Sequence, residues 1–223
     1  MWLLRKDPGL RLRLDGELDP GLVRPGLERL RSAGLIAGWF MSVYEPEIHQ
    51  FGGPAAMDAV HAYFDADTRA LLIASQAAGR RVTNTVLSLA ILNDLFERSL
   101  GAREEVWDVW CNLQAMYRGH GRPGAAIPAL TLERLAAVAG PAELELVALY
   151  EAANRRLAAA LDAAWRAGAL QCGRRSILPF VAAFHWNRHG FELERMATLA
   201  DAMAAAWSPK RGLRGAAAEA RPV

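Results

Sequence analysis

Hydrophobic and polar residues change their spacing along the first quarter of the chain. Leucine and arginine alternate over residues 10–14, which is the period of a half-buried strand with a packed leucine face and a cationic arginine face. Residues 22–33 then spread leucines among charged residues, a pattern typical of a short amphipathic helix that Gly34 would end. The apolar run over residues 38–43 predicts a second strand. Together these segments predict a small β-sheet with helical cover.

Beyond residue 55 the apolar positions recur at helical spacing. The predicted helices cover residues 55–64, 68–78, 82–99, 102–118, 131–138, 141–167 and 176–206, with Pro179 near a boundary or kink. The Gly-rich segment 118–124 predicts a loop, either a plain connection between helices or a mobile lid. The expected fold class is therefore α+β, with a small N-terminal β-sheet followed by a mainly α-helical bundle.

Composition favours one folded unit. Of the 223 residues, 52% are hydrophobic and 22% are charged, so we expect a single domain over residues 1–207 and a flexible tail over residues 208–223. The net charge of +2 gives no support to nucleic-acid binding. No apolar run approaches membrane-spanning length and the N-terminus lacks a secretion signal, so we expect a cytoplasmic protein without a membrane partner.

Cysteine and histidine spacing argues against a metal centre. Cys111 and Cys172 lie far apart without a CxxC pair, so both are expected to be reduced thiols. His185 and His189 are four residues apart, but no glutamate motif or third ligand accompanies them. The other histidines are scattered, at His49, His61 and His120. We therefore expect no metal site, and neither a P-loop nor a dinucleotide fingerprint is present.

Three groups of polar residues are candidates for chemistry. Tyr44, Glu47 and Gln50 supply a phenol, a carboxylate and an amide in the loop that Gly52, Gly53 and Pro54 end.

His185, Asn187 and Arg188 place a proton carrier, an amide and a cation at one end of a helix. A structural histidine, or an Arg188–Glu192 pair, is the competing interpretation.

Arg11 and Arg13 can bind a carboxylate or remain solvated. Tyr117 shares a helical face with Trp107 and Trp110, which would more often be core than a cleft.

Several segments, in order, resemble the C-terminal elimination domain of lanthipeptide dehydratases, which also occurs as free-standing thiopeptide biosynthesis proteins. They are Asp7–Leu14, Leu30–Ile36, the Tyr44–Glu47 loop, Phe64–Thr68 and His185–Arg188.

Two positions depart from that family's pattern. Gln50 stands where many elimination domains have an arginine that is thought to engage the glutamyl group, and a neutral amide lacks its charged fork. Ala183 stands where a histidine often precedes the Asn-Arg pair by four residues. With these departures, and because it starts at the first strand without the glutamylation domain, the sequence resembles the thiopeptide pyridine synthases.

The resemblance implies a cofactor-independent enzyme that joins two dehydroalanines of a ribosomal peptide by a formal [4+2] aza-cycloaddition, with loss of water and of the leader peptide. Tyr44, Gln50, Tyr117 and His185 are then the expected catalytic residues. The expected substrate-binding residues are Arg11, Arg13, Glu47, Asn187 and Arg188.

The expected partner is a dehydrated, azole-containing precursor peptide with a leader, and further biosynthetic enzymes are candidate partners. Two alternatives stay open: the glutamate-eliminating half of a split dehydratase, and a non-catalytic module that binds the precursor.

Overall fold

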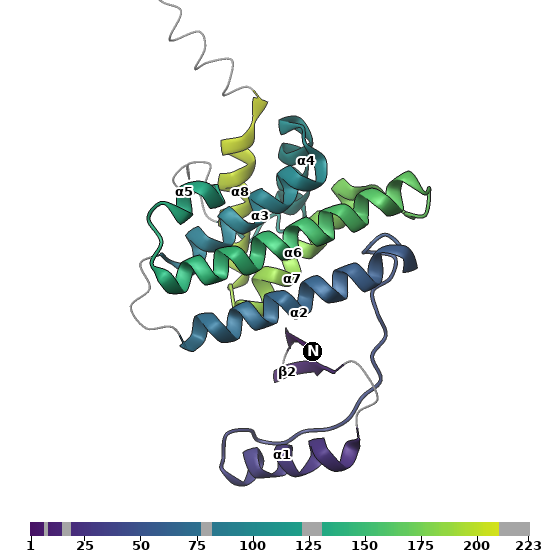
Figure 1. Cartoon of the computed structure of the whole chain (residues 1–223), viewed down its shortest axis with the longest axis vertical. Coiled ribbons are helices and arrows are strands. Elements are labelled where there is room, and N and C mark those ends of the chain that lie inside the picture. Colours follow the sequence, from purple (N-terminus) through teal and green to yellow (C-terminus); the bar gives the residue numbers. More distant parts are fainter. Residues whose placement is uncertain (7–8, 15–18, 77–81, 122–130, 210–223) are drawn as a thin grey trace, which may run out of the picture.

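The computed structural model describes residues 1–6, 9–14, 19–76, 82–121 and 131–209. Its elements are β1 (Trp2–Lys6), β2 (Gly9–Arg13), α1 (Pro20–Ser32), α2 (Pro54–Gln76), α3 (Asn84–Leu100), α4 (Arg103–Met116), α5 (Leu132–Ala136), α6 (Pro141–Arg166), α7 (Arg174–Arg188) and α8 (Leu193–Trp207). Figure 1 shows a body of packed helices, with the two strands against α2 and with α1 set apart beyond them. The expected α+β organisation, a small sheet followed by a helical bundle, is present.

The two strands form an antiparallel sheet whose faces are the reverse of the predicted ones. Leu10 and Leu12 are 64% and 48% exposed, so the leucines of β2 do not form the packed face. Arg13 pairs with Trp2, which is 6% exposed, so the arginine side of β2 is the side that turns toward the body. An alternating pattern defines two faces but does not say which one packs.

Side chains of two helices bind the edge of β1 that β2 leaves open. Asn187 of α7 accepts from the Arg5 N–H and donates to the Arg5 carbonyl, both at 2.9 Å, as a neighbouring strand would. Arg188 Nε donates to the Leu3 carbonyl at 3.0 Å, and the Leu3 N–H donates to Thr68 Oγ1 of α2 at 3.3 Å. These bonds fix the sheet on the helical body.

The prediction of a strand over residues 38–43 is wrong. This segment has no regular secondary structure, and Phe40 and Val43 are 85% and 87% exposed. A strand needs a neighbour to take its backbone hydrogen bonds, and the sheet found in the described residues contains only β1 and β2. β-propensity alone does not supply that neighbour.

Two helical boundaries also differ from prediction. The segments 55–64 and 68–78 join into the single helix α2, and the segment 176–206 divides into α7 and α8. The chain divides near Gly190, whose φ is 71°, and not at Pro179. Pro179 is buried inside α7, where it cannot donate to the carbonyl of Arg175 four residues earlier. Asn112 Nδ2 of α4 donates to that carbonyl instead, at 3.4 Å.

The core holds the helices in place around the sites described below. A large apolar cluster joins β1 with α2, α3, α4, α6, α7 and α8, and includes Phe51, Phe64, Trp110 and Trp186. A smaller cluster, around Tyr150, joins α2 and α3 with α5 and α6. Cys111 and Cys172 are free thiols, as expected. The end of the predicted loop 118–124 and nearly all of the predicted tail 208–223 lie outside the described residues.

Candidate active site

Four polar side chains meet at the edge of the body beside the sheet, and we call Arg13, Tyr44, Glu47 and His61 the Tyr44 cluster. The Arg13 guanidinium lies 4.8 Å from the centre of the Tyr44 ring. Tyr44 Oη lies 2.9 Å from His61 Nε2. Trp2 forms the aromatic floor, since its ring packs edge-on against Tyr44 and parallel to His61. Three residues predicted from sequence are therefore neighbours here.

The charges around Tyr44 favour its neutral phenol. Burial raises the pKa of Tyr44 to about 12, and the Glu47 carboxylate adds to the rise while Arg13 opposes it. At neutral pH the hydroxyl therefore keeps its proton and remains a hydrogen-bond donor. The cluster combines a stable donor, an imidazole within hydrogen-bond distance and two opposite charges, which is a set suited to proton transfer at a bound substrate.

Two atoms of the cluster are buried without a hydrogen-bond partner among the described residues. They are Arg13 Nε, a donor, and Glu47 Oε2, an acceptor. Buried polar atoms are normally satisfied, so an unsatisfied donor and acceptor beside one phenol point to a polar ligand. An amide, which offers both an acceptor and a donor, matches this pair.

The loop that carries Tyr44 and Glu47 is held in a compact turn before α2. The Gly53 N–H donates to the Ile48 carbonyl at 2.9 Å, and Gly52 and Gly53 have φ angles of 87° and 97°. Only glycine takes such angles readily. A Cβ on Gly52 would also lie 2.5 Å from Ile177 Cδ1. Gln50 is exposed within this turn.

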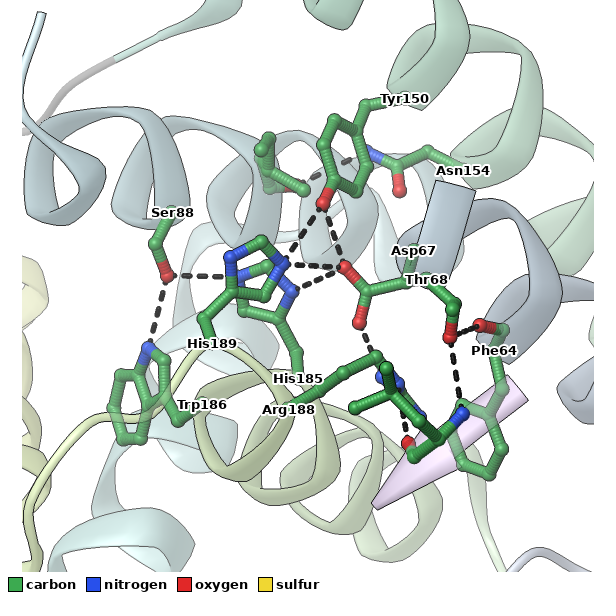
Figure 2. Close-up of polar contacts among 12 residues, drawn as sticks. Phe64, Asp67, Thr68, Ser88, Tyr150, Asn154, His185, Trp186, Arg188 and His189 are labelled. Carbon is green, nitrogen blue, oxygen red and sulfur yellow. Dashed lines mark hydrogen bonds and ion pairs between the residues drawn. The ribbon is translucent and has the colours of Figure 1, made fainter. Parts of the chain in front are cut away.

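A second group of polar side chains is buried between α2, α3, α6 and α7, and we call it the Asp67 network. Figure 2 shows its contacts. Asp67 Oδ1 lies 2.8 Å from His185 Nδ1, 3.0 Å from His189 Nε2 and 2.6 Å from Tyr150 Oη. Arg188 binds Asp67 Oδ2. His185 Nε2 lies 2.9 Å from Ser88 Oγ.

Electrostatics keep Asp67 ionised and His185 neutral. Burial alone would raise the pKa of Asp67, but His185, Arg188 and His189 hold it well below the usual range. Burial lowers the pKa of His185 more than the Asp67 carboxylate raises it. Since Asp67 and His185 are fully buried, the pair of Asp67 with Arg188 balances a charge that would otherwise be unstable there.

The remaining predicted site residues are spread over the molecule. His185, Asn187 and Arg188 are close in sequence, but His185 and Arg188 join the Asp67 network while Asn187 binds β1. Tyr117 packs against Trp186, and burial raises its pKa to about 12. Arg11 is exposed on β2.

Two aromatic rings separate the Tyr44 cluster from the Asp67 network. Contacts run from Tyr44 to Trp2, then to Phe64, and then to the Arg188 guanidinium, which lies 4.6 Å from the Phe64 ring. His185 therefore belongs to the buried group and does not reach Tyr44 through a direct polar contact in the described residues.

Sequence reasoning missed five polar partners that complete the two groups. They are His61 in the Tyr44 cluster, and Asp67, Ser88, Tyr150 and His189 in the Asp67 network. A signal existed for Asp67, because the residues three and four positions away on both sides are aromatic or apolar and place it on the packed face of a helix, where an aspartate must be paired.

Asp67, His185 and His189 place three potential metal-ligand atoms within 4.8 Å of one another. The same carboxylate already binds the buried Arg188 guanidinium. A divalent cation would add uncompensated charge to a buried site whose charges already balance, so the arrangement favours a hydrogen-bonded network over a metal centre.

A cavity of about 130 Å³ adjoins the Asp67 network. Its polar wall includes Ser88, Tyr150, His185 and His189. The rest of the wall is largely apolar, from residues such as Ala70, Leu87, Ile91 and Leu146.

Comparison with known proteins identifies the class of protein. The family described as lantibiotic biosynthesis dehydratase C-term matches residues 1–207. The chain belongs to this family, and its membership associates it with the biosynthesis of ribosomally made, modified peptides. No curated protein matches the chain significantly. Within the described residues, no helix is long and apolar enough to cross a membrane.

Proposed function

We propose that the chain modifies a dehydrated precursor peptide at the Tyr44 cluster, by the formal [4+2] aza-cycloaddition of two dehydroalanines. In this reaction a backbone amide tautomerises to an aza-diene, the ring closes, and water and the leader peptide are lost. The observation that carries the proposal is the pair Arg13 Nε and Glu47 Oε2, which find no hydrogen-bond partner in the described part of the chain and lie beside the protonated Tyr44.

Tyr44 is suited to stabilise the imidic acid form of the amide. Its phenol keeps its proton at neutral pH, and a neutral donor placed at an amide oxygen favours the tautomer that begins the cycloaddition. His61, 2.9 Å from Tyr44 Oη, takes the acid–base role in the proposal because it is the imidazole that touches the phenol.

Arg13 and Glu47 then position the peptide, with a donor and an acceptor for its backbone amide. Holding two distant parts of one peptide together supplies much of the rate enhancement expected of such an enzyme. The reaction needs no cofactor. Gln50, exposed on the same turn, is proposed to contact the peptide beyond the cluster.

The other predicted residues take supporting roles. Asn187 and Arg188 hold β1, and through it Arg13 of β2, against α7. Arg11, which is exposed on β2, remains a candidate for contact with the peptide, whereas Tyr117 is buried against Trp186 and supports the core. We place the reaction in the cytoplasm, where a ribosomally made precursor is produced.

Glutamate elimination is the second candidate, and Arg13 favours it. A guanidinium 4.8 Å from the Tyr44 ring can hold a glutamyl carboxylate that Gln50 cannot bind as an ion. His61 would then remove the α-proton.

A non-catalytic precursor-binding role is the third candidate. In the described residues, no strand pairs with the outer edge of β2, and Leu10 and Leu12 are exposed beside it. An extended peptide can add to such an edge.

One experiment separates the three candidates. The purified chain is incubated with a dehydroalanine-containing, azole-bearing precursor and, in a second tube, with a glutamylated precursor, and both are followed by mass spectrometry. Loss of water with release of the leader supports the cycloaddition. Loss of glutamate in the second tube overturns it in favour of elimination, and binding without a mass change favours the precursor-binding role.

A further inference from the structure

Three residues of the Asp67 network form a chain of hydrogen bonds that ends at a serine. Asp67 of α2 lies 2.8 Å from His185 Nδ1, and His185 Nε2 of α7 lies 2.9 Å from Ser88 Oγ of α3 (Figure 2). The order is carboxylate, imidazole, hydroxyl. We propose that Ser88, His185 and Asp67 form a second site, separate from the Tyr44 cluster, that transfers short, uncharged acyl groups from esters to Ser88.

The protons of this chain are placed for nucleophilic attack. Because Asp67 is ionised, it accepts from His185 Nδ1–H, and the neutral imidazole then has its lone pair on Nε2. Trp186 Nε1 donates to Ser88 Oγ at 3.0 Å and occupies an acceptor position of that oxygen. The Ser88 hydroxyl hydrogen is therefore free to point at His185 Nε2, which is the arrangement of an activated serine.

The cavity supplies a place for the acyl group. Ser88 and His185 both line it, and its volume of about 130 Å³ resembles the ~150 Å³ apolar cavity that holds a benzene molecule. The space suits an acyl chain of about six heavy atoms. Because most of its wall is apolar, a charged acyl group such as glutamyl is disfavoured.

The cavity also meets the first turns of α3. Asn84, Leu87 and Ser88 line it, so the N-terminal end of α3, where the helix dipole is positive, lies beside the space for the acyl group. That field stabilises the negative oxygen of a tetrahedral intermediate.

The reaction proceeds in two balanced steps. Ser88 Oγ attacks the ester carbonyl carbon as its proton passes to His185 Nε2, and the bond to the leaving alcohol breaks as that alcohol takes the proton. Water then attacks the acyl-Ser88 ester, again with His185 as base, and releases the carboxylic acid and the free serine. Asp67 touches neither substrate nor product and acts as a positioning residue.

Chemical labelling tests the site on the native protein. The chain is treated with an alkyl fluorophosphonate, and the modified residue is mapped by peptide mass spectrometry. Modification at Ser88 supports the proposal. A protein that stays unmodified, or is modified only elsewhere, overturns it, and neither result depends on the folding of a variant.

Ester turnover tests the same site with p-nitrophenyl acetate and butyrate. The Ser88→Ala variant is expected to lose at least about 100-fold of the wild-type rate, as serine enzymes do when the nucleophile is removed. Ser99→Ala is the matched control, because Ser99 is also buried on α3 but its Oγ has no partner in the described residues. Equal loss in both variants, or a retained rate in Ser88→Ala, overturns the proposal.

Two further measurements separate this site from the proposed peptide chemistry and test Asp67. Tyr44→Phe is expected to keep wild-type ester turnover, since the Tyr44 cluster is not in contact with Ser88. Asp67→Asn is expected to lose labelling of Ser88, and Asp67→Glu is expected to restore it. In the Asp67→Glu variant the labelling rate is expected to rise with pH as His185 loses its proton. Equal labelling in the Asn and Glu variants would show that Asp67 does not position His185.

Discussion

The Tyr44 cluster and the Asp67 network use similar side chains in opposite surroundings. Each contains an acid, a tyrosine, a histidine and an arginine. In the network these groups are buried and bind one another, and Arg188 Nη2 is their one atom without a hydrogen-bond partner among the described residues. The cluster is partly exposed, and there the described residues offer no partner to Arg13 Nε or to Glu47 Oε2. The hydrogen bonds within the buried network stabilise the fold, whereas the partly exposed cluster keeps two polar atoms for a ligand.

The two regions are coupled through β1. Arg188 binds Asp67 and the Leu3 carbonyl at once, and its guanidinium packs on Phe64. Trp2, at the start of β1, packs against both Phe64 and Tyr44. The network therefore positions the floor of the cluster.

The largest expected effect is on the stability of the network. Asp67→Ala leaves the buried Arg188 without its anion, so we expect the free energy of unfolding to fall by about 3–5 kcal/mol. Asp65→Ala is the control two residues along α2, where the ion pairs are exposed and we expect a loss of less than about 1 kcal/mol. Urea unfolding followed by circular dichroism measures both. Equal unfolding midpoints for the Asp67→Ala and Asp65→Ala variants would contradict a structural role of the network.

The next largest loss of stability is expected in the turn at Gly52, which connects the loop of the Tyr44 cluster to α2. Gly52→Ala places a Cβ 2.5 Å from Ile177 Cδ1 at a φ of 87°, so we expect a loss of at least about 2 kcal/mol. Gly168→Ala has a φ of 66° but open space around its Cβ, so it isolates the backbone strain of about 1–2 kcal/mol. Thermal unfolding of the two variants measures the difference, and a Gly52 variant no less stable than the Gly168 variant would contradict the packing of this turn.

The same glycines show what the sequence could predict. The pattern at Gly52 and Gly53 identified a constrained turn, and the long helices α3 and α6 lie close to their predicted ranges, because local spacing and turn chemistry decide both. The strand over residues 38–43 failed because a strand depends on a partner elsewhere in the chain.

The two candidate sites show the same difference between features that local sequence determines and features that depend on distant residues. Arg13, Tyr44 and Glu47 were all candidates from sequence, and the structure brings them together. The Asp67 network draws its residues from four helices, and no local pattern joins Ser88 to His185 across 97 residues. Long-range polar partners of this kind follow from packing alone.

A smaller effect is expected in the pH dependence of stability. Burial lowers the pKa of His185 in the folded state, so below pH ~6.5 the unfolded chain binds a proton that the folded chain does not. Stability from this group is therefore complete above that pH and is lost as the pH falls. His185→Gln is expected to flatten the decline between pH ~6.5 and 5, whereas the exposed His120→Gln is not. Unfolding midpoints at several pH values measure the slope, and equal slopes for wild type and His185→Gln would contradict a buried neutral imidazole.

Replacing a tyrosine by phenylalanine in each region separates the two regions most directly, and its effect on stability at Tyr44 is the smallest that we expect. Tyr150→Phe removes a 2.6 Å hydrogen bond to the Asp67 carboxylate, so we expect a loss of about 1.5–3 kcal/mol. Tyr44→Phe removes a hydroxyl at a partly exposed site, so we expect a loss of less than about 0.5 kcal/mol. If the cluster is the site of peptide chemistry, Tyr44→Phe nevertheless slows product formation by about 10-fold or more, because the donor that stabilises the tautomer is gone. Product is followed by mass spectrometry at matched fractions of folded protein. Unchanged turnover in Tyr44→Phe would show that the cluster takes no part in the mechanism. The stability difference between the two variants would still be expected, because it follows from the hydrogen bond between Tyr150 and Asp67.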